Sequence, residues 1–238
     1  MSGKEPPPSP NRLTREAVLS GTMRKLLEIA YPTAKLITDA EHRASVQAIL
    51  QARPDGGGDV WLFAYGSLIW NPMIYFVEQR IATVHGYHRR FCLWTNLGRG
   101  SSARPGLVLG LDRGGACRGL AYRIAEPIVQ EELELLWRRE MITAAYRPRW
   151  LRVVTQEGGR GWAIAFLINR AHPRYAGLVP EDKVIDAIAH ASGALGACAN
   201  YLFNTAARLE ALGIRDRHLF HLRDRVTQLL ESQKKSPE

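Results

Sequence analysis

The chain has 238 residues, of which 46% are hydrophobic and 23% charged; this composition suits one folded domain with a sizeable core and excludes a fibre or a disordered tail. The 32 Lys+Arg outnumber the 23 Asp+Glu, and the net charge of +9 favours anionic partners such as small anions, nucleic acid or a membrane surface. Cys92, Cys117 and Cys198 are too few and too scattered for a disulfide framework or a zinc site, which indicates a reducing compartment.

The sequence predicts no membrane span and no secretory signal. No segment reaches the roughly 18 consecutive apolar residues that a spanning helix needs. The apolar core of a signal peptide is missing, because Pro6–Pro10 and Arg12–Glu16 stand where it would lie. We therefore expect a cytoplasmic protein without a membrane partner.

Residues 1–58 are predicted to form an N-terminal helical extension, of which residues 1–11, rich in Pro, Ser and Gly, should be disordered. Thr14 can cap a first helix that runs to about residue 30. Thr38 and Glu41 form a capping box for a second helix. A proline and a run of three glycines then end the extension, and the main domain is expected over residues 59–238.

In the main domain, strand patterns dominate the middle and helical patterns the end. The expected strands are 60–63, 80–85, 88–94, 107–111, 117–124, 150–155 and 161–167, and the expected helices are 127–141, 181–192, 196–212 and 216–231. Gly114 and Gly115 predict a hairpin turn between two of the strands. Because neighbouring strands are joined by short turns, the pattern favours an α+β fold: a curled mixed or antiparallel sheet, or a small barrel, flanked by helices.

The first candidate site is the tetrapeptide Tyr65-Gly66-Ser67-Leu68, which follows a buried strand. A turn there can point several backbone N–H groups at an anion, and Gly66 allows a ligand to approach closely. On these four residues alone, an ordinary strand-ending turn is favoured over a binding site.

The second candidate is Glu140, at the end of a helix and among several arginines. A carboxylate is unfavourable at a helix C-terminus, and unfavourable placement can mark function. A surface ion pair with a neighbouring arginine is the alternative. His85 and His88 lack a third ligand at a convincing distance, so no metal site is predicted.

Together, the ordered segments resemble the ChaC-like γ-glutamylcyclotransferases over about residues 60–215. The matching segments are Phe63–Pro72, Gly86–Trp94, Arg104–Leu111, Cys117–Arg123, Trp137–Met141 with Tyr146–Pro148, Ala171–Gly177 and Tyr201–Thr205. Members of this family cleave γ-glutamyl compounds, typically glutathione, to 5-oxoproline and the remaining amine, here Cys-Gly. The resemblance implies the family's γ-glutamylcyclotransferase-like fold and such an enzyme.

The resemblance also implies the roles of the candidate residues. Glu140 becomes the catalytic acid/base, and the substrate pocket is lined by Ala64, Tyr65, Gly66, Ser67, Leu68 and Ile69. The reaction is an intramolecular aminolysis, which needs conformation and proton transfer but no metal, cofactor or covalent intermediate. Tyr146 could hydrogen-bond the substrate or Glu140, and Arg90 could receive the glycyl carboxylate of glutathione.

Three alternatives stay open at this stage. The family usually has Gly at Ala64, a Gly pair at Ala144-Ala145 and an Asp-His pair within residues 95–100, so another γ-glutamyl peptide or a γ-glutamylamine is possible as substrate. A non-catalytic protein resembling a regulator of cation transport is the second alternative. Nucleic-acid binding, suggested by charge alone, is not expected, because the arginines are dispersed through strands and turns. The oligomeric state is left undetermined.

Overall fold

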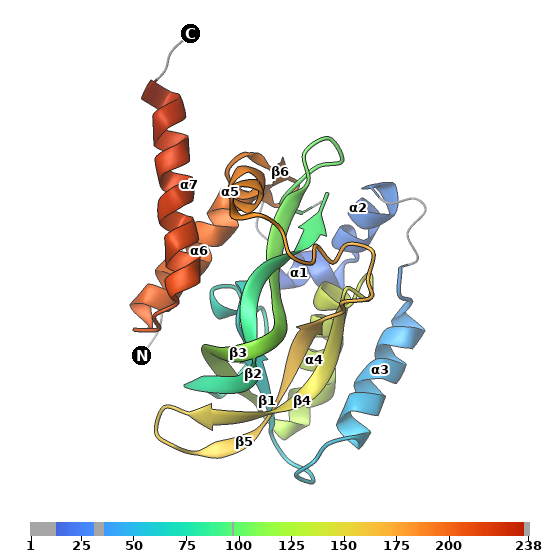
Figure 1. The fold of residues 1–238 in the computed structure, drawn as a ribbon. Coiled ribbons are helices and arrows are strands. Elements are labelled where there is room, and N and C mark those ends of the chain that lie inside the picture. Colours follow the sequence, from blue (N-terminus) through green and yellow to red (C-terminus); the bar gives the residue numbers. More distant parts are fainter. Residues whose placement is uncertain (1–12, 31–35, 97, 236–238) are drawn as a thin grey trace.

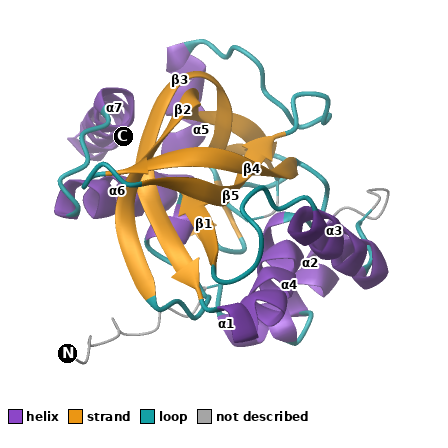
Figure 2. Cartoon of the chain, turned by 90° about the horizontal axis from the view of Figure 1, so that it is seen from below, coloured by secondary structure: helices purple, strands orange, loops and turns teal. Residues whose placement is uncertain are grey.

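The computed structural model describes residues 13–30, 36–96 and 98–235. Five strands form a closed barrel in the order β1-β3-β2-β4-β5. Two groups of helices lie on opposite sides of this barrel, α1–α4 on one side and α5–α7 on the other (Figures 1 and 2). The expected α+β class, with a small barrel flanked by helices, is confirmed.

The barrel strands are β1 (Val60–Ala64), β2 (Glu78–Thr95), β3 (Gly106–Ile124), β4 (Tyr146–Thr155) and β5 (Arg160–Ile168). Antiparallel pairing joins β1 to β3, β3 to β2, β2 to β4 and β4 to β5. Parallel contacts of β5 with β1 and β3 close the barrel. The large side chains of Phe63, Phe166 and Leu111 are fully buried, so apolar burial holds the barrel together.

The predicted hairpin at Gly114-Gly115 is wrong. Residues 106–124 form one strand that pairs with β2 along nearly its whole length, and the four expected short strands are therefore two long ones. The register shifts between His85 and Tyr87, where Gly114 and Gly115, at φ 106° and 67°, face Gly86, at φ 83°. The glycines form a bulge, which bends the two strands so that the barrel can close.

The N-terminal extension contains α1 (Arg15–Leu19), α2 (Thr22–Ala30) and α3 (Asp39–Gln51). The first expected helix is broken in two at Gly21, which has φ 73°. The cap at Thr14 and the capping box of Thr38 and Glu41 are both confirmed. The segment 1–11, expected to be disordered, lies outside the described residues.

The extension packs on α4 (Val129–Glu140), the helix that ends in the candidate acid/base. Arg15 pairs with the buried Glu132 at 2.7 Å, and the Trp137 indole N–H donates to Ser45 Oγ at 2.9 Å. Beyond the helix end, the Ile37 N–H donates to the Ile142 carbonyl at 2.9 Å. These contacts hold the extension against α4 along its length and against the segment just after Glu140.

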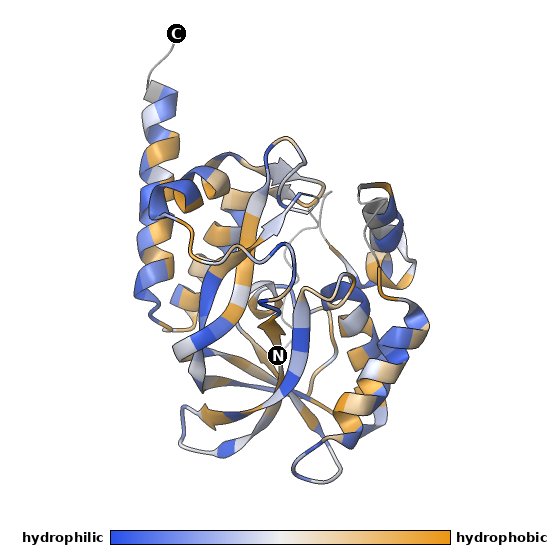
Figure 3. Cartoon of the chain, turned by 45° about the vertical axis from the view of Figure 1, so that its right-hand side comes forward, coloured by the Kyte–Doolittle hydropathy of each residue, from blue (hydrophilic) through white to orange (hydrophobic). Residues whose placement is uncertain are grey.

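On the other side of the barrel lie α5 (Glu181–His190), α6 (Cys198–Ala211) and α7 (Arg217–Lys235), with a small hairpin of β6 (Ser192–Gly193) and β7 (Gly196–Ala197) before α6. The helices carry both apolar and polar stripes, as expected for elements with one face on a core (Figure 3). No helix within the described ranges is long and apolar enough to cross a membrane.

Candidate active site

The loop after β1 presents backbone N–H groups. A short 3-10 turn (Ser67–Ile69) follows Gly66, and the Ile69 N–H donates to the Gly66 carbonyl at 2.9 Å. Within the described residues, no hydrogen bond engages the N–H groups of Gly66, Ser67 and Leu68. Unused N–H groups at the start of a turn are suited to an anion or a developing oxyanion.

Other groups of the same loop form hydrogen bonds within the protein. The Tyr65 hydroxyl donates to the Phe166 carbonyl at 2.7 Å, and the Tyr122 hydroxyl donates to the Leu68 carbonyl at 3.1 Å. Ala64 and Ile69 are buried in the core. The Tyr65 side chain and the Leu68 carbonyl therefore fix the loop in place, and the N–H groups of Gly66, Ser67 and Leu68 are left to bind a ligand.

Glu140 is the last residue of α4 and its side chain is 16% exposed. Burial raises the pKa of this carboxyl above its ordinary value, while the Arg139 guanidinium, with its Nε 2.9 Å from Glu140 Oε1, opposes the shift. The negative end of the helix dipole also favours the protonated acid. A carboxyl with a raised pKa and a small opening can both take and return a proton near neutral pH.

Arg139 links Glu140 to the loop after β1. Its Nη2 donates to Ser67 Oγ at 2.9 Å and its Nη1 donates to the Asn71 carbonyl at 2.6 Å. The side chain is only 5% exposed, so these contacts are shielded from water. The two candidates that the sequence singled out, far apart in the chain, thus meet through one arginine.

The Glu140 charge acts on three buried tyrosines. Burial and the Glu140 charge together raise the pKa of Tyr65, Tyr146 and Tyr201, so all three phenols stay protonated at neutral pH. The Tyr146 hydroxyl donates to the Leu109 carbonyl at 2.8 Å. A Cβ added to Gly66 would lie 2.9 Å from the Tyr201 hydroxyl oxygen, so this position needs glycine for close approach.

The structure places the remaining predicted residue, Arg90, elsewhere. Its Nη2 pairs with Asp112 Oδ2 at 2.8 Å and donates to the Tyr175 hydroxyl at 3.0 Å. It has no described contact with Glu140 or with the loop, and its role in substrate binding stays a prediction.

Sequence reasoning gave no role to two residues that the fold brings here, Tyr201 and Arg99. The Arg99 guanidinium lies 6.0 Å from the centre of the Tyr201 ring. Tyr201 lies in a late helix whose pattern shows only a buried face, and Arg99 lies between two expected strands. The glycines on either side of Arg99 were the one available signal of a tightly packed segment.

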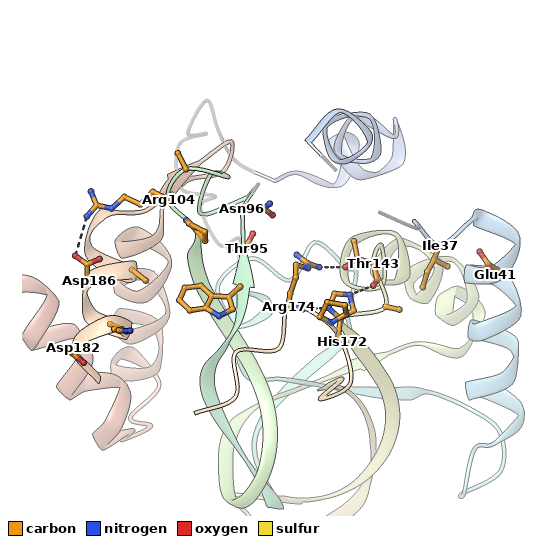
Figure 4. A pocket seen from close by; sticks show the side chains of 17 residues that line it. Ile37, Glu41, Thr95, Asn96, Arg104, Thr143, His172, Arg174, Asp182 and Asp186 are labelled. Atoms are coloured by element: carbon orange, nitrogen blue, oxygen red, sulfur yellow. Dashed lines mark hydrogen bonds and ion pairs between the residues drawn. The ribbon is translucent and has the colours of Figure 1, made fainter. Parts of the chain in front are cut away.

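A cavity of about 1450 Å³ lies next to the segment that follows Glu140 (Figure 4). Thr143 and Ala144 form part of its lining, and the Thr143 carbonyl accepts a hydrogen bond from His172 Nε2 at 2.9 Å. The N-terminal extension contributes Ile37 and Glu41 on the same side as Thr143, and Arg104, Asp182 and Asp186 line the other side (Figure 4). The extension therefore helps to enclose space beside the candidate site.

The cysteines are unsuited to nucleophilic catalysis at neutral pH. Cys92 and Cys117 are buried, as expected for core residues, and Cys198 is buried as well. Burial raises the pKa of Cys92 to about 12 and that of Cys198 to about 11. Across the part of the chain that the structure describes, no group of three or more His, Cys, Asp and Glu side chains is arranged to hold a metal ion.

Comparisons of the sequence with known proteins point to one family. The profile described as ChaC-like protein matches residues 60–229. A protein of Escherichia coli K12 named glutathione-specific gamma-glutamylcyclotransferase is 43% identical over 196 residues, which are 82% of this chain and 84% of that protein. A Mus musculus protein named glutathione-specific gamma-glutamylcyclotransferase 1 is 33% identical over 184 residues, 74% of this chain and 82% of that protein.

Among solved structures, a γ-glutamyl cyclotransferase specific to glutathione from yeast has the same fold. The TM-score is 0.67 at 20% sequence identity, and the match covers 72% of this chain and 97% of that one. With the profile match over more than half of its length, the chain belongs to the ChaC-like family.

Proposed function

We propose that this protein is a γ-glutamylcyclotransferase that cleaves glutathione to 5-oxoproline and Cys-Gly. The observation that carries the proposal is the buried Glu140 carboxyl, held 2.9 Å from Arg139, which also binds Ser67 of the loop. The names of the E. coli and mouse relatives support glutathione as the substrate. The buried free cysteines suit a reducing compartment, and we place the activity in the cytoplasm.

In this mechanism Glu140 moves two protons, one after the other. The α-ammonium of the γ-glutamyl group first loses a proton to the Glu140 carboxylate. The free amine then attacks the γ-carbonyl carbon of its own side chain and forms the C–N bond of the five-membered ring. The proton held by Glu140 passes to the cysteinyl nitrogen, and the bond from the γ-carbonyl carbon to that nitrogen breaks. The Glu140 carboxylate then takes the second proton from the ring nitrogen, which becomes the amide N–H of 5-oxoproline, and passes it to the amine of Cys-Gly, which departs as an ammonium. Because the nucleophile is tethered to the electrophile, the effective molarity is high and conformation decides the rate.

The loop after β1 supplies that conformation. The N–H groups of Gly66, Ser67 and Leu68 hold either the α-carboxylate, which orients the amine, or the carbonyl oxygen that becomes negative. We retain Ala64, Tyr65 and Ile69 as residues that shape this pocket, since their burial fixes the loop. The substrate contacts predicted from the sequence for Tyr146 and Arg90 receive less support, because the Tyr146 hydroxyl donates to the Leu109 carbonyl and Arg90 pairs with Asp112.

Two other functions fit parts of the chain. The same chemistry on another γ-glutamyl peptide or a γ-glutamylamine is consistent with Ala64 and Ala144-Ala145, where the family usually has glycines. A binding protein without turnover is the second, but the carboxyl with a raised pKa beside unused N–H groups favours an enzyme.

The test is release of 5-oxoproline by the purified protein, measured by mass spectrometry. Glutathione, γ-glutamyl-alanine and γ-glutamyl-lysine are compared, with Glu140→Gln as the variant that keeps the shape of the side chain and removes the base. We expect release from glutathione, reduced by at least about 100-fold in the variant. Release from another compound alone would move the specificity and keep the mechanism. Full turnover by a folded Glu140→Gln protein would rule out the assignment of the base.

A further inference from the structure

Arg99 is a half-buried cation that lacks a carboxylate partner among the described residues. Its Nη1 donates to the Ala197 carbonyl at 3.3 Å, and its guanidinium carbon lies 6.0 Å from the centre of the Tyr201 ring. Burial lowers the pKa of Arg99, with only Tyr201 and Cys198 opposing the shift. By contrast, Arg139 pairs with Glu140 and Arg90 pairs with Asp112. A partly desolvated cation in this position is suited to an anion from outside the chain.

The backbone that carries Arg99 is held rigidly. The Leu195 N–H donates to the Gly98 carbonyl at 2.8 Å. A Cβ on Gly100 would lie 2.2 Å from the Gly106 nitrogen and 2.3 Å from the Thr95 carbonyl oxygen, so the segment fits only because it has no side chain there. Arg99 is therefore presented from a fixed backbone, which reduces the entropy lost when it binds a ligand.

Tyr201 connects Arg99 to the loop after β1: its ring centre lies 6.0 Å from the Arg99 guanidinium carbon, and its hydroxyl oxygen would lie 2.9 Å from a Cβ on Gly66. The Glu140 charge raises the pKa of Tyr201 and the Arg99 charge lowers it. Glu140 is held to the same loop from another side, because Arg139 pairs with Glu140 at 2.9 Å and donates to Ser67 Oγ at 2.9 Å. Arg99 thus lies at the Tyr201 side of the loop, and Glu140 lies at the Arg139 side.

We infer that Arg99 binds the carboxylate at the far end of the substrate, the glycine carboxylate of a γ-glutamyl tripeptide. This inference rests on the proposed cyclotransferase function. The other carboxylate of glutathione is attached to the same carbon as the attacking amine, so it has to lie at the loop beside Glu140. The glycine carboxylate lies beyond the bond that breaks, on the side where Arg99 stands. Arg99 therefore selects tripeptides that end in a free carboxylate over shorter or amidated γ-glutamyl compounds.

The experiment compares Arg99→Met with wild type on glutathione and on glutathione whose glycine carboxylate is an amide. Arg113→Met, an exposed position in the β2–β3 bulge, is the matched control because it removes the same charge. We expect Arg99→Met to raise KM for glutathione by about 10- to 100-fold with kcat within about threefold, the loss typical of a charge-assisted hydrogen bond. Wild type should lose a similar factor on the amide, and Arg99→Met should no longer distinguish the two compounds.

Two results would overturn the inference. In the first, Arg99→Met keeps the wild-type KM for glutathione. In the second, it loses the same factor on both compounds, which would place Arg99 at the γ-glutamyl end. Calorimetric binding of glutathione to Glu140→Gln, with and without Arg99→Met, tests the same contact without turnover. Loss of affinity in the double variant supports Arg99 even if wild type releases no 5-oxoproline, and unchanged affinity contradicts the inference. Failure of the proposed function is thereby distinguished from failure of this contact.

Discussion

The candidate site has an arginine on each of two sides, Arg139 in α4 and Arg99 next to the start of α6, and the two differ in how many of their N–H donors have partners. On the α4 wall, the Arg139 guanidinium contacts Glu140, Ser67 and the Asn71 carbonyl, and little of its side chain is exposed. On the other side, next to α6, Arg99 contacts the Ala197 carbonyl at 3.3 Å and the Tyr201 ring, and no carboxylate of the described residues pairs with it. The N–H donors of Arg139 are largely engaged by protein groups. Among the described residues, Arg99 has a single hydrogen-bond acceptor, so most of its N–H donors can bind a ligand.

The difference indicates that Arg139 positions Glu140, whereas Arg99 binds the substrate. A saturated arginine cannot bind substrate without breaking buried contacts, but it can fix a carboxylate and tune its pKa. An unsaturated arginine adds little to the stability of the free protein and gains its partner only when substrate arrives. Replacing Arg139 should therefore alter proton transfer, whereas replacing Arg99 should alter affinity.

The largest effect is expected from Arg139→Met. Arg139 lowers the pKa of Glu140 against the effect of burial, so its removal raises that pKa further. The acid limb of kcat/KM, below which Glu140 is protonated and cannot accept a proton, should then move to higher pH. We expect kcat/KM at neutral pH to fall by about 10- to 100-fold and to recover partly on the alkaline side.

The measurement is the profile of kcat/KM between about pH 5 and 9. Arg138→Met is the control, because Arg138 is the neighbour on the same helix and its ion pair is with Asp39, at 3.6 Å, rather than with Glu140. An acid limb that stays in place in Arg139→Met would show that Arg139 does not tune Glu140.

Gly66→Ala tests the close approach of the loop after β1 to Tyr201 of α6. The new Cβ would lie 2.9 Å from the Tyr201 hydroxyl oxygen, so the tyrosine or the loop must shift. We expect kcat/KM to fall by about tenfold or more, as is usual when a positioning loop is displaced. Gly161→Ala is the control, since no atom lies within 4 Å of the added Cβ. Adding Tyr201→Phe removes the oxygen that the Cβ meets and should restore part of the loss; no recovery would place the conflict elsewhere.

The sequence was most informative where structure is local. The capping box at Thr38 depends on a residue three positions on, and the β1 strand is a short apolar run, so both could be predicted. The glycine pair at 114–115 could not be resolved, because the same residues serve a hairpin turn or a bulge. The choice depends on the pairing of β3 with β2 over nearly its whole length, which is a property of the closed barrel.

The candidate site shows the same division. Glu140 and the loop after β1 could be predicted as separate segments, but their link through Arg139 requires the tertiary structure. Tyr201 reaches the loop from α6, more than a hundred residues away in the chain, and nothing in its helix distinguishes it from a core tyrosine. Arg90 carried the right chemistry for a carboxylate, and the fold supplies that carboxylate internally, from Asp112.

Arg90→Met should therefore affect stability more than catalysis. Its partner Asp112 is 1% exposed and also pairs with Arg170 at 2.6 Å. Losing one hydrogen-bonded partner of a buried carboxylate should lower the free energy of unfolding by about 1–3 kcal/mol, with KM within about threefold. Burial raises the pKa of Asp112, but hydrogen bonds from Arg170, Tyr175 and the Arg113 N–H lower it overall, so the stabilisation by the ionised carboxylate is present at neutral pH and is lost as pH falls through the lowered pKa.

Urea unfolding at neutral pH and in acid, run beside steady-state kinetics, measures both quantities. The Asp112→Asn variant should lower stability too, and the double variant should lose less than the sum of the two. A KM for glutathione that rises as much in Arg90→Met as in Arg99→Met would return Arg90 to the substrate site.

The smallest effect is expected from Tyr146→Phe, although Tyr146 lies beside Glu140. Its hydroxyl proton is donated to the Leu109 carbonyl at 2.8 Å, so the group is not free to donate to a substrate oxygen. Its pKa is raised well above the ordinary value by burial and by its neighbours Tyr201 and Glu140, so it cannot serve as the base either. Kinetics of Tyr146→Phe should show kcat/KM within about fivefold of wild type and the same acid limb, with a loss of about 1 kcal/mol in unfolding. A loss of about 100-fold would instead place the phenol on the reacting atoms, with the Leu109 contact exchanged for substrate during turnover.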